Sequence, residues 1–276
     1  MKNALFLCCH NSYSIIPPLF NPIQCGAALN PCIAGVIHDN DGENISIKNR
    51  EYCELTAHYY AWKNISADYY GFCHYRRLFC IDDSIERPYL VFSQLPDERL
   101  LGTGEQWEKL ISGYEIIAPR SENMGLTVRE HYCGSQYHYA DDLNLFIKIL
   151  KKQSPHLSET VEKYLSQQRQ YFCNMFIMDK AHFYEYCDML FNALNEFDLL
   201  KKPHGDFQSD RADGYLGEIF TGIYISYCYE NKVLIKELPR LDICCSAKKR
   251  ISDALFPPES KRRFLAKKIV KGLRRK

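Results

Sequence analysis

Residues 68–79 (DYYGFCHYRRLF) join an apolar stretch to basic side chains of the kind that bind anions. The apolar part, residues 69–73, is typical of a buried central strand. His74, Arg76 and Arg77 follow at its carboxyl end. Open α/β sheets bind their ligands at that edge, so the sequence predicts a ligand site there.

The two adjacent arginines indicate what kind of ligand this is. Burying two guanidinium groups is costly unless an anion meets them, and guanidinium forks bind phosphate oxygens in pairs. We therefore expect a phosphate or diphosphate at Arg76 and Arg77. The alternative is that both arginines pair with Asp82 or Asp83 in a solvated loop.

A candidate metal site lies in the turn-rich segment 38–44 (HDNDGEN). Asp39 and Asp41 have the D-x-D spacing that can bind a divalent metal. Asp and Asn are also the default residues of turns, and we favour that interpretation of the segment. A zinc site is not expected, because none of the 13 cysteines forms a C-x-x-C pair.

A helix before the strand must position this basic edge. Apolar residues recur there at helical spacing: Tyr52, Leu55, Tyr59 and Trp62. The pattern predicts one helix that ends at 63–64 and feeds the strand, which is an α/β arrangement. Glu54 lies beside the apolar stripe, either as a substrate ligand or as a favourable charge at a helix start. Gly71 in the strand leaves room for a close backbone neighbour.

Further polar residues fall on or near other predicted elements. Strands are predicted at 4–9, 114–118, 170–178 and 233–238, and helices at 140–151, 180–197 and 210–230. Segment 21–36 is predicted to be a loop with short structure. His10 follows the strand at 4–9. Asn174 is a lone amide within the apolar run of the strand at 170–178, where its side chain must form hydrogen bonds either within the core or with a ligand.

Composition excludes several functional classes. The chain of 276 residues has 46% apolar residues, enough for one large or two small domains. It has no Walker loop, no G-x-G-x-x-G after the first strand and no G-x-S-x-G elbow. No apolar run reaches the length of a membrane span, and the first strand follows Met1 without a signal peptide, so we expect a cytoplasmic protein.

The end of the chain differs in charge from the rest. Residues 261–276 hold nine Lys and Arg and no acid, so the remainder carries a net charge of −8. Apolar residues recur there at helical spacing: Ala266, Ile269, Val270 and Leu273. This predicts a basic amphipathic helix on an anionic membrane surface, and a solvated basic end is the alternative. Because the basic residues gather in this tail, nucleic-acid binding is not expected.

Several blocks of residues resemble a bacterial family long catalogued as a domain of unknown function. These blocks are 41–46 (DGENIS), 48–49, 52–56 (YCELT), 61–64 (AWKN), 71–77 (GFCHYRR), 131–132, 138, 174–178 (NMFIM) and 211–218. They occur in order over roughly 4–239. Members of this family are usually described as glycosyltransferases of capsular, exopolysaccharide or lipopolysaccharide synthesis.

The resemblance implies a nucleotide-sugar-dependent glycosyltransferase with a GT-A-like fold, a Rossmann-type mixed α/β sheet flanked by helices. It implies one domain over 1–245, followed by the basic tail at 246–276. The expected donor is a UDP-sugar, and the expected acceptor is a lipid-linked glycan at the inner face of the cytoplasmic membrane. GT-A folds usually carry a metal-binding D-x-D after a central strand, but His74-Tyr75-Arg76 stands at the corresponding place, which leaves metal dependence open.

Glycosyl transfer needs a group that stabilises the departing diphosphate and a base for the acceptor hydroxyl. Arg76, Arg77 and Lys48 are the candidates for the first role. The other residues expected in the donor site are His10, Asn44, Asn49, His74, Tyr75, Asn174 and Arg211. The candidate bases are Glu218, Asp206 and Glu54, of which we prefer Glu218 because its helix also carries Arg211. A non-catalytic sugar- or nucleotide-binding subunit and a sugar phosphotransferase remain as alternatives.

Overall fold

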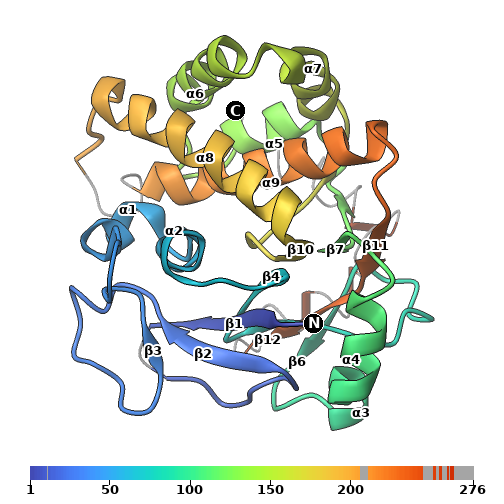
Figure 1. Ribbon diagram of the computed structural model, residues 1–276. Helices are drawn as coiled ribbons and strands as arrows, with labels where there is room; N and C mark the ends of the chain where they lie inside the picture. The colour runs from blue at the N-terminus through green and yellow to red at the C-terminus, as the bar shows by residue number, and fades with distance from the viewer. Residues whose placement is uncertain are drawn as a thin grey trace.

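A mixed sheet forms the centre of the protein (Figure 1). The computed structural model describes residues 1–10, 12–205 and 211–244, with a few positions between 251 and 263. Across the sheet the strands run in the order β11 (Ile235–Leu238), β7 (Ile116–Pro119), β10 (Phe176–Asp179), β4 (Tyr69–His74), β1 (Asn3–Cys9), β2 (Phe20–Gln24) and β3 (Ile37–His38). The strands from β4 to β3 are parallel, whereas β10 is antiparallel to both β4 and β7.

A small set of strands extends the sheet beyond the carboxyl end of β4. It consists of β5 (Arg77–Phe79), β12 (Arg240–Ile243) and β6 (Tyr89–Phe92). β5 turns back antiparallel to β4, and β12 pairs antiparallel with β5 and parallel with β6. A separate two-stranded ribbon joins β8 (Glu122–Asn123) to β9 (Arg169–Gln170).

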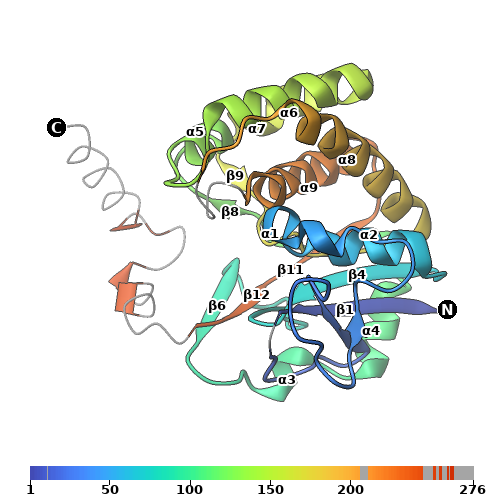
Figure 2. The same ribbon diagram turned by 90° about the vertical axis from the view of Figure 1, so that its left-hand side faces the viewer.

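Helices cover both faces of the sheet (Figure 2). One face carries α1 (Asn49–Tyr52), α2 (Leu55–Asn64), α8 (Lys180–Leu200) and α9 (Ala212–Glu230). Farther from the sheet, above α8 and α9 in Figure 1, lie α5 (Val128–Cys133), α6 (Ala140–Gln153) and α7 (Ser158–Ser166). The opposite face is covered by α3 (Glu98–Leu101) and α4 (Gly104–Ile111).

Alternation along the central strands supplies two hydrophobic cores. Phe6 of β1 and Phe72 of β4 pack with the large helical layer, whereas Leu5 and Leu7 of β1 pack with Trp107 of α4. Strands buried on both faces are typical of parallel sheets. The predicted strands and most of the predicted helices near this core are therefore found close to their expected positions.

Gly71 is required for a different reason from the close backbone neighbour that the sequence suggested. A Cβ atom at this position would lie 2.7 Å from the Leu5 side chain and 2.8 Å from that of Ile177. These residues pair with Gly71 in the two neighbouring strands. The glycine therefore makes room for the side chains of β1 and β10, not for another backbone.

The structure corrects two predicted elements. The strand expected at 170–178 begins only at Phe176, because Cys173 and Asn174 have φ of +79° and +47°. The single helix expected up to 63–64 is broken before Glu54, where Cys53 has φ of +52°. Segment 21–36 holds the end of β2 in an otherwise irregular stretch, as predicted. Non-glycine residues rarely adopt positive φ, and these breaks adjoin the candidate site described below.

Two predictions lie outside the described residues. They are Asp206 as a candidate base and most of the basic helix expected over 246–276. Among the helices that are described, none combines the length and apolar character needed to cross a membrane.

Candidate functional site

Basic side chains converge where β1 and β4 end. His74 closes β4 and His10 follows β1, with 6.4 Å between their ring centroids. The Tyr75 ring lies 4.4 Å from that of His74 and 4.8 Å from the Arg76 guanidinium carbon. The predicted donor-site residues of this edge are thus brought together by the turn that links β4 to β5.

His74 is neutral in this setting. Its pKa lies well below the ordinary value, first because the ring is buried and then because Arg77, His10, Arg76 and Arg211 surround it with positive charge. The backbone N–H of Arg76 donates to His74 Nδ1 at 3.4 Å. His74 can therefore act as a neutral hydrogen-bond donor through Nε2.

Arg77 is half-buried and begins β5 opposite His74. Within the part of the chain that the structure describes, its guanidinium has neither a hydrogen bond nor an ion pair. The aspartates considered as partners are used elsewhere: Asp83 pairs with Lys236, and Asp82 accepts a hydrogen bond from Ser84. A charge held in this way is prepared to meet an anion.

Two carboxylates lie close to these cations. Glu218 of α9 accepts a hydrogen bond of 2.8 Å from the backbone N–H of Cys173. The pKa of Glu218 is raised to about 7, first by burial and then by the Glu54 carboxylate, with the Arg77 charge acting in the opposite direction. A carboxyl group that titrates near neutrality can accept or return a proton at physiological pH.

Asn174 connects Glu54 with α9. Its Nδ2 donates to Glu54 Oε1 at 3.3 Å and to the carbonyl of Gly214 at 3.2 Å. Its Oδ1 accepts from the Thr221 hydroxyl at 3.4 Å. Both ends of the amide are therefore occupied by the protein, so Asn174 positions Glu54 and is not open for the ligand contact that the sequence suggested.

Glycines on α9 allow the segment around Glu54 to approach. A Cβ at Gly214 would lie 2.9 Å from Cys53 Sγ, and one at Gly217 would lie 2.7 Å from the Leu55 side chain. Arg211, at the start of α9, donates from Nε to Cys53 Sγ at 3.2 Å. The break at Cys53 is thus packed against α9, which places Glu54 and Glu218 on the same side of the sheet.

Sequence reasoning missed the charged residues of β12. Arg240 is 4% exposed and bonds from Nε to Asp242 at 2.6 Å and from Nη2 to Glu122 at 2.9 Å. Its Nη1 is buried without a hydrogen-bond partner among the described residues. Asp242 lies opposite Arg77 in the strand pairing. The sequence does carry a sign of this strand, because Arg240 and Asp242 are charged and Leu241 between them is apolar. Alternate residues of a strand point to the same face, so this pattern predicts a strand with both charges on one face.

Three predicted donor-site residues have structural partners away from the strand edge. Lys48 forms an ion pair with Asp198 at 2.8 Å. Asn44 bonds to the carbonyls of 40 and 42 within its own turn. Asn49 is buried and donates from its side chain to the Cys53 carbonyl at 2.6 Å, so it stabilises the backbone where the helix is interrupted before Glu54.

The D-x-D pair belongs to the structure of its loop. Asp39 is fully buried, and its carboxylate accepts hydrogen bonds from Gly26 N, Ala27 N, Ser46 Oγ and Thr56 Oγ1. Asp41 is exposed. Four donors occupy the acceptor positions that a metal ion would need, so turn chemistry accounts for this pair.

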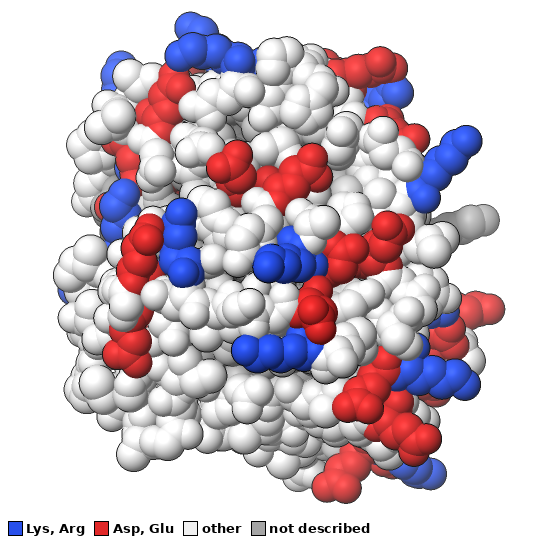
Figure 3. Space-filling model, viewed as in Figure 1, with Lys and Arg blue, Asp and Glu red and all other residues white. Residues whose placement is uncertain are grey.

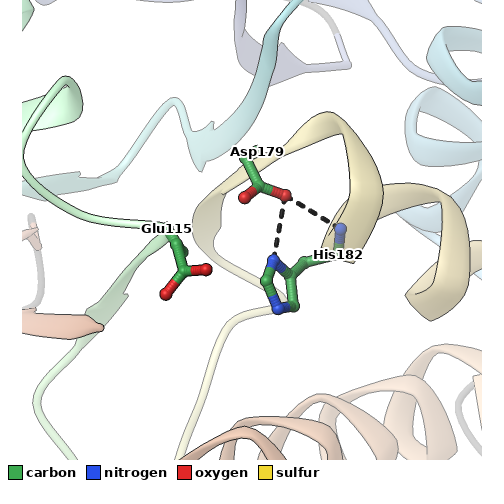
Figure 4. A group of neighbouring side chains, drawn as sticks. All are labelled: Glu115, Asp179 and His182. Carbon is green, nitrogen blue, oxygen red and sulfur yellow. Dashed lines mark hydrogen bonds and ion pairs between the residues drawn. The ribbon is translucent and has the colours of Figure 1, made fainter. Parts of the chain in front are cut away.

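A second group of possible metal ligands lies near the amino end of β4. It consists of Glu115, Asp179 and His182 (Figure 4). Asp179 caps α8 and accepts from His182 N and Nδ1, each at 2.9 Å, while Glu115 accepts from Leu234 N at 2.8 Å. Asp179 pairs with Tyr69, at the amino end of β4. These contacts serve a helix start and a strand connection, away from His74.

A further carboxylate group surrounds a lysine. Lys201 Nζ lies 3.3 Å from Glu51, 2.7 Å from Asp198 and 2.6 Å from Asp213. The ammonium group occupies the position in which a cation would neutralise the three acids. On the face shown in Figure 3, acidic and basic side chains are likewise intermingled.

Comparison with known proteins adds to this geometry. A solved structure described as "WbbM bifunctional glycosytransferase apo structure" matches with a TM-score of 0.82 and 27% sequence identity, over 88% of this chain and 45% of that one. The chain therefore spans less than half the length of that protein, and its fold is the GT-A-like mixed α/β fold that the family resemblance implied. A comparison with curated proteins finds no match. Residues 4–231 match the family described as "Domain of unknown function (DUF4422)", and the chain belongs to this family.

Proposed function

We propose that this protein is a glycosyltransferase that moves a sugar from a nucleotide-sugar donor, in the first place a UDP-sugar, to a glycan acceptor. The observation that carries the proposal is the half-buried Arg77, which forms no hydrogen bond or ion pair within the described residues and lies opposite His74, next to Arg76. The likeness to the glycosyltransferase structure supports the same reaction class.

The donor diphosphate lies against the basic residues at the ends of β1 and β4. Arg77 and Arg76 bind its oxygens, and neutral His74 donates a hydrogen bond. Preorganised donors of this kind stabilise the negative charge that grows on a departing diphosphate. Because cationic side chains perform this role, the proposed reaction does not depend on a metal ion.

Glu218 receives the proton of the acceptor hydroxyl. The hydroxyl oxygen forms a bond to the anomeric carbon of the sugar while the bond from that carbon to the diphosphate breaks. The bonding pair leaves with the nucleoside diphosphate, and the proton goes to the Glu218 carboxylate. A base with a pKa of about 7 suits this transfer at neutral pH.

The proposed acceptor is a lipid-linked glycan of capsule, exopolysaccharide or lipopolysaccharide synthesis at the inner face of the cytoplasmic membrane. The nine Lys and Arg within residues 261–276 support this choice, since anionic lipids attract basic segments.

Thermal-shift titration of the purified protein with nucleoside diphosphates and nucleotide sugars tests the donor site. We expect stabilisation by the diphosphates of one base, equally with manganese and with EDTA. Arg77→Met should lower that affinity roughly ten- to hundredfold, as expected for a lost charged hydrogen bond. Arg99→Met is the control, because Arg99 is exposed and pairs with Asp97.

Other outcomes would contradict parts of the proposal. Stabilisation that disappears with EDTA would show that a metal is required and that the role given to Arg77 is wrong. Binding without any sugar transfer to glycan acceptors would favour a non-catalytic binding subunit. Release of a sugar phosphate or nucleoside monophosphate would indicate a phosphotransferase.

A further inference from the structure

Glu54 has a position and a bonding pattern that differ from those of Glu218. We propose that Glu54, held by Asn174, binds hydroxyl groups of the sugar being transferred and so helps to select the donor sugar. This inference rests on the proposed function and divides the two carboxylates of the site between donor and acceptor.

The first step in the argument is the place of Glu54 in the fold. It precedes α2, and its carboxylate accepts a hydrogen bond from Asn174, which comes just before β10. β10 runs antiparallel to β4, with Phe176 opposite Phe72, so its start lies at the carboxyl end of β4. That is the side of the site where the donor diphosphate is proposed to lie.

Glu218 lies among other elements. Its charge interacts with Arg77 of β5 and Arg240 of β12, and its carboxylate bonds to the N–H of Cys173 before β10. These strands form the extension of the sheet beyond β4. The two carboxylates thus bond to adjacent residues, Cys173 and Asn174, but only Glu218 bonds beside the cations of β5 and β12.

The second step is the acceptor capacity that Glu54 retains. Asn174 Nδ2 bonds to Oε1 at 3.3 Å, and Oε2 has no hydrogen bond within the described residues. The side chain is only partly buried. An ionised carboxylate accepts several hydrogen bonds, and those from sugar hydroxyls are strengthened by its charge. A polyhydroxylated group matches this capacity, whereas a phosphate would be repelled.

The third step is the fixed position of Glu54. Asn174 is 2% exposed, and its Nδ2 also bonds to the Gly214 carbonyl of α9. Cys53, Cys173 and Asn174 all have positive φ. Such backbone is costly and persists where the surrounding structure determines it. Asn174 is therefore a positioning residue for Glu54, and its loss should act through Glu54.

The test compares two ligands that differ only in the sugar. Calorimetric titration would measure the affinity for a nucleotide sugar and for its nucleoside diphosphate, with the wild type, Glu54→Gln, Glu54→Ala, Asn174→Ala and Glu218→Gln. Both Glu54 variants and Asn174→Ala should weaken nucleotide-sugar binding roughly ten- to hundredfold and leave diphosphate binding unchanged. Glu218→Gln should bind both ligands as the wild type does and lose transfer.

Glu51→Gln is the matched control, because Glu51 lies three residues away and pairs with Lys201. Equal weakening of both ligands by the Glu54 variants, or no weakening, would overturn the inference while the donor site stands. A selective loss of nucleotide-sugar binding in Glu218→Gln would overturn it too. Failure of the wild type to bind any nucleoside diphosphate would instead refute the proposed function, and with it this inference.

Discussion

At the scale of single residues, two opposing effects act on Arg77. Its side chain is half-buried and forms no hydrogen bond or ion pair within the described chain. Withdrawing the charge from water costs stability, whereas the nearby Cys173, Asp242 and Glu218 raise the pKa of Arg77 and so favour its charged form. The guanidinium therefore stays charged without a direct partner in the free protein.

We therefore expect Arg77→Met to change the stability of the free protein by less than about 1 kcal/mol, because the cost of burying the charge and its attraction to the nearby acids offset each other. In a protein of this size the melting temperature should then shift by no more than roughly 2–4 °C. Differential scanning calorimetry without ligand measures this shift. A larger fall in the melting temperature of Arg77→Met would show that Arg77 has a direct stabilising partner.

Glu218 should impose a pH dependence on stability. Its pKa rises from 4.5 to about 7 on folding, so between these values the folded state binds the proton more tightly. The contribution is complete below pH 4.5 and is lost as the pH rises to 7, on the order of 2–3 kcal/mol. Denaturation of the wild type and Glu218→Gln across this range measures the difference.

The expected result is a free-energy difference between the two proteins that changes with pH up to about 7 and is constant above it. The rate of transfer should show the opposite trend, because the base must be ionised, and should rise with pH through about 7. A flat difference across this range would contradict the raised pKa.

At the scale of elements, the sequence predicted the regular parts well. The helical periodicity at 180–197 and the apolar run at 69–73 correspond to α8 and β4. In both segments the apolar residues recur at the spacing of the element, because those residues must face the core, and such a repeated pattern is easy to recognise in a sequence. The basic turn at 74–77 also follows the carboxyl end of β4, as the order of residues at 69–77 predicted.

The breaks that shape the site were not predictable from the sequence. Cys53, Cys173 and Asn174 have positive φ without being glycine, and tertiary contacts decide such positions. Lys48 and Asn44 lie in a block that resembles the family, yet their partners are Asp198 and the local turn. A motif in sequence does not separate residues that hold a loop from residues that touch a ligand.

Asp39 and Asp41 offer a direct comparison within one motif. Asp39→Asn should cost about 2–4 kcal/mol of unfolding free energy, because an amide cannot accept from all four donors and places its own N–H₂ against some of them. Asp41→Asn should change stability by less than about 0.5 kcal/mol, as at an ordinary surface position. Urea denaturation measures both. If Asp39→Asn is as stable as the wild type but loses activity that added manganese restores, Asp39 would instead have a role in metal binding.

The contact between α9 and α7 depends on a glycine. A Cβ at position 222 would overlap the ring and hydroxyl of Tyr164, which is buried and accepts from Tyr171 N at 3.2 Å. Gly222→Ala should therefore cost about 1–3 kcal/mol or more. Gly113→Ala is the control, since its Cβ would meet its nearest atom at 3.5 Å. Equal melting temperatures for the two variants would show that α7 can move away from α9.

At the scale of the whole molecule, charge is divided between a body with net −8 and the basic residues 261–276. A protein that ends at residue 245 should remain folded and bind nucleoside diphosphate as the full chain does. It should lose flotation with vesicles that contain anionic lipid, and this flotation should weaken with salt in the full chain. Vesicles of neutral lipid are the control. Unchanged flotation after truncation would place the membrane contact elsewhere.

The position of β12 sets where this unit can be exchanged between enzymes. The family match ends at 231, whereas Arg240 and Asp242 complete the inner face beside Arg77. The similar WbbM chain is more than twice as long as its matched part, so units of this type occur inside larger proteins. A transplant cut at the family boundary would carry the strands at the core of the sheet but leave behind part of the wall of the site. Hybrid proteins built from this family should therefore be joined after Cys244.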